Sequence, residues 1–164
     1  MHDTGSAASA TRTNRVPVDL HLLALDACAD LQHRHRGITL RIEVEPHGPF
    51  LVDATVAELR RCVDNLVTNA QRFAEQHIVV RVRATASGVE LRVDDDGPGL
   101  PNPAAYAQAW QASVRFHAED GKSGSGIGLS IVRSIIEHLG GGVVAVPSPL
   151  GGAGFGFTLP HART

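Results

Sequence analysis

Three aspartates run directly into a glycine-proline-glycine turn in the segment 94–100, DDDGPGL. A carboxylate only accepts hydrogen bonds, so it suits an amino group and would repel a phosphate. Gly97 and Gly99 would let a flat ring approach the backbone without a side-chain clash. A calcium loop spreads its oxygen ligands over a longer segment, and Pro98 stiffens this one. A turn, a calcium site and a base-binding segment are all compatible with this pattern, and calcium is the weakest of the three.

A polar stripe follows one flank of the helix predicted over residues 54–74. Its members are spaced i, i+4, i+8 and i+11, beside the apolar face: Arg61, Asn65, Asn69 and Arg72. An ordinary solvated flank would account for Arg61 alone. Asparagine, however, is a poor helix former, and its carbonyl can ligate Mg²⁺, which takes few protein ligands together with phosphates and water. The stripe therefore predicts a magnesium site at Asn69.

Glycines open a further predicted helix in the segment 124–129, GSGIGL. Bare backbone N–H groups and the positive end of the helix dipole make such a start a phosphate cradle. A flexible hinge is nearly as compatible with glycines alone. The Walker ending is absent, and no strand runs directly into these glycines as a Rossmann fingerprint requires. Taken together, the acidic turn would receive a base, Asn69 the magnesium, and the glycines the phosphates of a nucleotide.

Composition favours one globular domain over residues 16–161, preceded by a flexible lead-in or linker at 1–15. The chain has 164 residues, 43% of them hydrophobic, and a net charge of -2, which suits a single core. No basic excess points to nucleic acid, and no window approaches the ~20 apolar residues of a membrane span. Cys28 and Cys62 lie in apolar helical patterns and are expected to be buried thiols.

Hydrophobic periodicity predicts an α/β two-layer sandwich, with a mixed sheet of about five strands and three main helices on one face. Strands and helices alternate in groups, with a hairpin bend at Gly88 and a long loop over 97–125. The predicted helices are 19–35, 54–74 and the segment after 124. The predicted strands are 38–45, 50–53, 78–83, 89–94, 143–147 and 154–159.

Four ordered segments resemble the N, G1, G2 and terminal glycine boxes of sensor histidine kinases. They are LRRCVDNLVTNAQRFA, VDDDGPGL, GSGIGLSIVRSIIEHLGGGV and GGAGFGFTLP. These kinases belong to the ATPase superfamily that includes gyrase, Hsp90 and MutL, and the resemblance covers residues 16–160. It implies ATP and Mg²⁺ as cofactors, bound between helices under a long, mobile ATP lid.

The resemblance assigns catalytic roles to three residues of the N box. Asn69 resembles the magnesium-binding asparagine, Asn65 the upstream polar residue, and Arg72 the basic residue that reaches phosphate. The cofactor-binding residues that it implies, besides Asn69 and Arg72, are Phe73 against adenine, Asp96 on the adenine amino group, Gly97, Gly99, Leu100, Arg115 and Lys122 in the lid, Gly124, Ser125, Gly126, Ile127, Gly128, Leu129 and Thr158.

Asn65 also discriminates within the superfamily. Hydrolytic members carry a glutamate four residues before the magnesium asparagine, where it acts as general base. An amide cannot take a proton from water at neutral pH, so we expect slow hydrolysis and transfer of the γ-phosphoryl to a histidine, which is its own nucleophile. The alternatives are an ATP-hydrolysing conformational switch of the MutL or gyrase type, and a nucleotide-binding or partner-docking domain without transferase activity.

None of the nine histidines has the setting of the family's phosphoacceptor. The segment 33–37, HRHRG, ends a predicted helix and favours solvated cations over a metal site. In the lid, Trp110 and Ser113 stand where the family often has two phenylalanines. The expected partners are thus ATP or ADP, the histidine-bearing dimerisation domain of a parent kinase and, indirectly, a response regulator. The isolated domain is expected to be monomeric and to face the cytoplasm, whether or not the parent spans a membrane.

Overall fold

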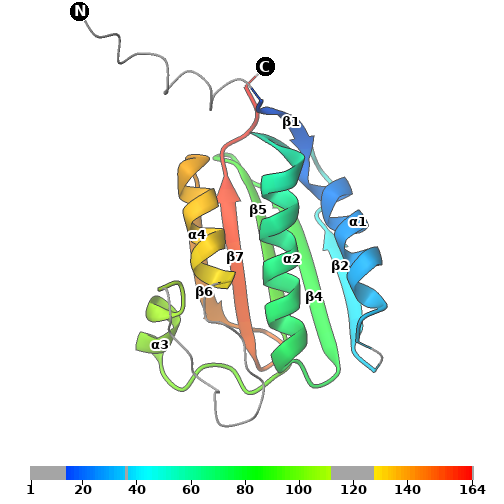
Figure 1. Cartoon of the computed structure of the whole chain (residues 1–164), viewed down its shortest axis with the longest axis vertical. Coiled ribbons are helices and arrows are strands. Elements are labelled where there is room, and N and C mark those ends of the chain that lie inside the picture. Colours follow the sequence, from blue (N-terminus) through cyan, green and yellow to red (C-terminus); the bar gives the residue numbers. More distant parts are fainter. Residues whose placement is uncertain (1–13, 36, 112–127, 164) are drawn as a thin grey trace, which may run out of the picture.

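A five-stranded sheet carries three helices on one of its faces (Figure 1). The computed structural model describes residues 14–35, 37–111 and 128–163. The predicted two-layer α/β sandwich is confirmed. The elements in chain order are β1 (Val16–Asp19), α1 (Leu20–Gln32), β2 (Thr39–Val44), β3 (Leu51–Ala54), α2 (Val56–Phe73), β4 (His77–Ala84), β5 (Val89–Asp95), α3 (Pro103–Gln108), α4 (Gly128–His138), β6 (Gly142–Pro147) and β7 (Ala153–Leu159).

The strands of the main sheet follow the order β2-β4-β5-β7-β6. β2 runs parallel to β4, and the other neighbours are antiparallel, so the sheet is mixed. The predicted hairpin is the β4–β5 pair. In the β5–β7 pair, Asp94 lies opposite Gly154. The carboxyl end of β5 therefore meets the beginning of β7 at one end of the sheet.

Two elements were not anticipated from the sequence. β1 pairs with β3 in a separate two-stranded sheet, so the predicted strand 50–53 does not join the main sheet. The short helix α3 begins at Pro103 within the expected loop 97–125, and the Asn102 side chain accepts a hydrogen bond from the Ala105 N–H at its start. Proline in the first helical turn and asparagine at the N-cap are both favourable there. Residues 112–127 of that expected loop lie outside the described part of the chain.

Helix α2 is the central helix of the layer, and its sequence specifies both its buried face and its start. The apolar positions at helical spacing are all buried: Leu59, Cys62, Val63, Leu66, Val67 and Ala70. At the start, the Thr55 hydroxyl accepts from the Glu58 N–H at 3.1 Å, and the Glu58 carboxylate accepts from Thr55 in return. This capping box satisfies backbone donors that otherwise lack partners.

Thr55→Ala removes the capping oxygen of α2 and is expected to lower the free energy of unfolding by about 1 kcal/mol. Urea unfolding followed by circular dichroism measures this change. Thr68→Ala, in the middle of the same helix, is the matched control, and it should be neutral or slightly stabilising because alanine is the better helix former. Equal destabilisation by the two substitutions would contradict the capping role.

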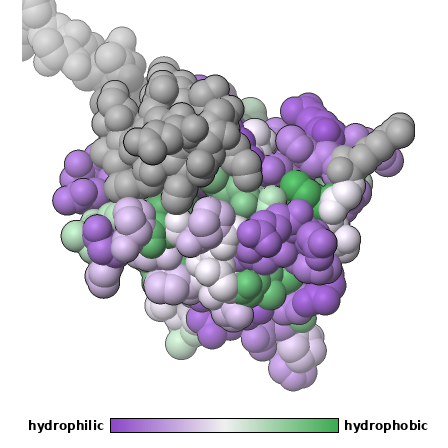
Figure 2. Space-filling model, turned by 90° about the horizontal axis from the view of Figure 1, so that it is seen from below, coloured by the Kyte–Doolittle hydropathy of each residue, from purple (hydrophilic) through white to green (hydrophobic). Residues whose placement is uncertain are grey.

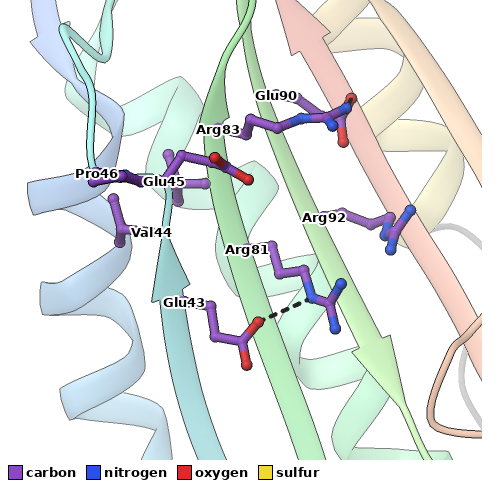
Figure 3. A pocket seen from close by; sticks show the side chains of 9 residues that line it. Glu43, Val44, Glu45, Pro46, Arg81, Arg83, Glu90 and Arg92 are labelled. Atoms are coloured by element: carbon purple, nitrogen blue, oxygen red, sulfur yellow. Dashed lines mark hydrogen bonds and ion pairs between the residues drawn. The ribbon is translucent and has the colours of Figure 1, made fainter.

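The two faces of the sheet have opposite chemistry. Val80, Leu91 and Phe157 point to the helices and are at most 1% exposed, and burial of such side chains contributes about 1.5–3 kcal/mol each. The face without helices, called here the open face, carries charged side chains. It holds a hollow of about 290 Å³ (Figure 3). The residues that line it are Glu43, Val44, Glu45, Pro46, Arg81, Val82, Arg83, Glu90 and Arg92.

The two cysteines are free and buried, as expected. Burial raises the pKa of Cys28 to about 11 and that of Cys62 to about 12, so both remain thiols at neutral pH. Among the described residues, no helix is both long and apolar enough to cross a membrane.

Candidate nucleotide-binding site

The expected site residues that the structure describes gather mainly at the lower end of the molecule in Figure 1. There α2 and β5 end and β7 begins, whereas α4 begins higher, beside Asn65 of α2. The space-filling view from below shows apolar side chains between more numerous hydrophilic ones at this end (Figure 2). The three aspartates of the acidic segment reach this end together, but their side chains enter three different environments.

Asp95 is the last residue of β5, and its carboxylate points to the helix side of the sheet. The side chain is 2% exposed. Its Oδ1 accepts hydrogen bonds from the N–H groups of Gly97, at 2.9 Å, and Ala153, at 3.2 Å. Burial raises the pKa of Asp95, and these two donors oppose the rise. Because both bonds go to Oδ1, the Oδ2 atom has no hydrogen bond from the described residues and is available to a donor from outside the protein.

Asp96 caps the loop between α2 and β4. Its two carboxylate oxygens accept hydrogen bonds from the backbone N–H groups of Glu75, Gln76 and His77, at 2.8–3.1 Å. Burial alone would raise the pKa of Asp96, but the donors Gln76, His77 and Glu75 outweigh it and hold the pKa below its usual value. A carboxylate used in this way has a structural role, which argues against the expected contact with adenine.

The low pKa of Asp96 makes a prediction about acid stability. An acid whose pKa is lowered by folding contributes stability above its unfolded-state pKa, and this contribution is lost as the pH falls through the folded-state pKa. Wild type should therefore exceed Asp96→Asn in free energy of unfolding at pH 7, and the difference should disappear as the pH falls from about 4 downwards. Urea unfolding of both proteins across this range measures it. A difference that does not change with pH would show that the carboxylate charge is not involved.

The polar stripe of α2 lies beside the beginning of α4. The Asn65 amide donates to the Gly128 carbonyl at 3.3 Å, so it ties α2 to the first residue of α4. Asn69 is half-buried one turn further along, and Arg72 and Phe73 are half-buried at the end of the helix. Asn65 thus has a positioning role that its spacing did not suggest. Asn69 makes no hydrogen bond with its side chain among the described residues, which suits a ligand position.

The glycines of the G1 turn are required by neighbouring protein atoms. A Cβ atom at Gly97 would lie 2.2 Å from the Phe73 carbonyl oxygen, so the turn packs on the end of α2. Gly99 has a φ of 71°, a conformation that favours glycine. The Leu100 N–H donates to the Tyr106 hydroxyl at 3.1 Å. Close packing at Gly97 and the positive φ at Gly99 each account for a glycine in the protein itself, so these glycines alone do not indicate a bound base.

Helix α4 begins at Gly128, where the resemblance placed the end of the phosphate-binding glycines. Among the described residues, a Cβ atom there would meet nothing closer than Asn65 Cγ at 4.0 Å. Leu129 packs against the core. The other expected residues of this region lie outside the described chain: Arg115, Lys122, Gly124, Ser125, Gly126, Ile127 and the lid position Ser113. Trp110 is buried against Phe155, with ring centroids 5.6 Å apart at 86°.

Thr158 is not part of the site. On β7, Phe155, Phe157 and Leu159 face the core, so the alternation of a strand places Thr158 on the open face. It lies opposite Glu90 in the sheet register, whereas Gly154 lies opposite Asp94. Thr158 is therefore four residues, or about 13 Å, from the end of the sheet that holds Asp95.

Residues 151–153 contribute to the site in a way that the sequence analysis missed. The Gly152 N–H donates to the Asp95 carbonyl at 3.2 Å, and a Cβ atom at Gly152 would lie only 2.0 Å from Asp95 Oδ1. The terminal glycine box thus packs directly on Asp95. The alternation of Val89, Leu91 and Val93 continues to Asp95, and this signal could have distinguished Asp95 from its two neighbours.

Comparison with known proteins places this geometry in a family. Residues 54–163 match the family described as "Histidine kinase-, DNA gyrase B-, and HSP90-like ATPase". The chain belongs to this ATPase family. It is 34% identical over 145 residues to the sensor protein RstB of Escherichia coli K12, a match that covers 87% of this chain and 33% of RstB. It is 36% identical over 134 residues to the sensor histidine kinase CpxA of the same strain, covering 80% of this chain and 29% of CpxA.

Solved structures share this fold. A mycobacterial sensor histidine kinase, MprB, aligns with a TM-score of 0.79 and 24% identity over 91% of this chain and 100% of that one, which supports the fold. Full-length ShkA in complex with AMPPNP aligns with a TM-score of 0.77 and 30% identity over 92% of this chain and 32% of that one. The present chain therefore spans about a third of the length of RstB, CpxA and ShkA.

Proposed function

We propose that this chain is the ATP-binding catalytic domain of a sensor histidine kinase. It binds Mg-ATP and transfers the γ-phosphoryl to a histidine on a separate dimerisation and phosphoacceptor domain of its parent protein. The single observation that carries this proposal is the buried Asp95 carboxylate beside the end of α2: its Oδ1 accepts from the Gly97 and Ala153 N–H groups, and its Oδ2 has no hydrogen bond from the described residues. The AMPPNP bound by the related ShkA is consistent with the same use of the fold.

The roles divide among three parts of the site. Asp95, in place of the expected Asp96, accepts a hydrogen bond from the amino group of adenine, and Phe73 lies against the base. Asn69 holds Mg²⁺, which takes its remaining ligands from phosphate and water. The N-terminus of α4 at Gly128 receives the phosphates, helped by Arg72. Phosphate contacts are also proposed for the preceding glycines, Arg115 and Lys122, and these rest only on the positions of those residues in the sequence.

Transfer is favoured over hydrolysis because Asn65 cannot act as a general base. Its amide donates to the Gly128 carbonyl, so it also holds the two helices that flank the phosphates. The histidine acceptor needs no activation by this domain, and positioning and charge neutralisation remain as its main contributions. The domain would act on the cytoplasmic side as a monomer that docks on the dimeric parent domain.

Phosphoryl transfer in a reconstituted mixture tests the function. The 164-residue chain, ATP labelled on the γ-phosphate and the separately purified histidine-bearing domain of the parent should yield a phosphoprotein with the acid lability of phosphohistidine. A steady release of phosphate by the isolated chain, with no labelled acceptor, would favour the hydrolytic switch. ATP binding without transfer or hydrolysis would favour a regulatory nucleotide-binding domain.

A further inference from the structure

Asp94 lies on the open face of the sheet, one residue before Asp95, and is fully buried. Its Oδ2 is 3.2 Å from Arg92 Nε and 3.6 Å from Arg81 Nε. Arg81 in turn is 3.4 Å from Glu43, and Figure 3 shows this pair beside Arg92. A carboxylate out of water is costly unless cations and hydrogen bonds compensate it. A small ionic network on the open face therefore stabilises one buried carboxylate directly behind the nucleotide site.

Asp94 also reduces the repulsion between the two arginines. Arg81 and Arg92 lie directly opposite each other on β4 and β5. Like charges in that relation destabilise an antiparallel pair. Asp94 and Glu43 together supply the two negative charges that offset them. Loss of the Asp94 charge would leave one positive charge of this pair uncompensated and would remove the partner of Arg92.

Strand β7 closes over this network. A Cβ atom at Gly154 would lie 2.3 Å from Asp94 Oδ1, and one at Gly156 would lie 2.9 Å from Arg92 Cα. Glycine at these positions lets the backbone of β7 rest on Asp94 and Arg92. The residue before Gly154 is Ala153, whose N–H donates to Asp95 Oδ1. One dipeptide of β7 thus contacts Asp94 on one face of the sheet and Asp95 on the other.

We propose that Asp94 is a positioning residue for adenine recognition. Through its contacts with Arg92 and Gly154 it fixes the position of the Ala153 N–H relative to Asp95, and thereby the orientation of the Asp95 carboxylate. This inference rests on the proposed function. Asp94 itself touches no nucleotide, because it lies on the face of the sheet opposite the helices. Its loss should impair recognition of the adenine amino group and leave the phosphate and metal contacts at α2 and α4 intact.

Asp94→Asn keeps the volume of the side chain and removes its charge. Glu90→Gln is the matched control, because Glu90 lies four residues earlier on the same face of β5 and pairs with Arg83 at 3.1 Å (Figure 3). Calorimetry measures the Kd of ATP and of the purine ribonucleoside triphosphate that lacks the 6-amino group. Asp94→Asn is expected to weaken ATP about tenfold and the analogue less than about twofold, because only ATP offers Asp95 a donor. Glu90→Gln should leave both values unchanged.

The outcomes separate this inference from the proposed function. The wild type should prefer ATP over the analogue. If Asp94→Asn keeps this preference, or if Glu90→Gln loses it to the same extent as Asp94→Asn, the positioning role is overturned. Equal weakening of both nucleotides overturns it as well, since that is the signature of general destabilisation. Should Asp94→Asn fail to fold, Arg92→Lys decides in its place: it keeps the positive charge, loses the Nε donor, and should reduce the preference by a smaller factor. A wild type that shows no preference for ATP refutes the role of Asp95 and with it the inference.

Discussion

Asn69→Ala is expected to abolish the Mg²⁺-dependent part of ATP binding and to slow phosphoryl transfer at least about 100-fold. Asn69 is half-buried on the stripe of α2 that faces the site, and an amide oxygen is a suitable ligand for Mg²⁺. Alanine leaves the helix intact because it is the best helix former. Calorimetric titration of ATP with and without Mg²⁺ measures the effect on binding, and the reconstituted transfer reaction measures the effect on rate.

The control for this substitution is Arg61→Ala, two turns earlier on the same stripe, where the side chain is exposed. It should leave both the Kd and the transfer rate near their wild-type values. Unchanged Mg²⁺ dependence and unchanged transfer in Asn69→Ala would show that Asn69 is not a magnesium ligand. A loss of thermal stability in Asn69→Ala that Arg61→Ala does not show would mean that the amide is structural.

Asp95→Asn is expected to weaken ATP binding by about 10- to 100-fold, whereas Asp96→Asn should change it little at neutral pH. A charge-assisted hydrogen bond contributes about 1.5–3 kcal/mol, and Asp95 offers its Oδ2 to the adenine amino group in the proposed complex. Asp96 already satisfies its oxygens with the N–H groups of Glu75, Gln76 and His77. Calorimetry with ATP measures both substitutions at the same pH and salt.

The two neighbouring carboxylates are controls for each other, because they differ in environment and not in chemistry. A greater loss of ATP affinity in Asp96→Asn than in Asp95→Asn would reverse the assignment. The affinity for the analogue without the 6-amino group adds a second criterion, since Asp95→Asn should barely change it. Equal losses for ATP and for this analogue would indicate a distorted turn and no contact with the base.

Much of the fold was predictable because its helices and strands have clear periods. The apolar positions of α2 are all buried, and the alternating strands of the main sheet have one face on the core. β1 and α3 escaped prediction for a physical reason. β1 has four residues and is specified by its pairing with β3, which lies more than thirty positions away, and α3 has six residues, too few to show a period.

The candidate site was predictable as a set of segments and less so as individual atoms. Spacing alone placed Asn65 and Asn69 on one stripe, and the glycine pattern placed Gly128 at the beginning of a helix, where α4 begins. The resemblance assigned the adenine contact to Asp96, although the alternation of Val89, Leu91 and Val93 continues to Asp95. The N–H groups that occupy Asp96 come from residues 75–77, a separate segment, and spacing could not reveal them. Gly97 and Gly152 are glycines because a carbonyl and a carboxylate lie against them, which only the packing of distant segments reveals.

The proposed division of roles is tested most directly by a crystal structure of this chain with a non-hydrolysable ATP analogue and Mg²⁺. The predicted result is an adenine amino group within about 3.2 Å of Asp95 Oδ2, a magnesium ion on the Asn69 amide oxygen, and phosphates at the N-terminus of α4. A purine bound on the open face of the sheet, or one held by Asp96 with Asp95 out of contact, would contradict the account.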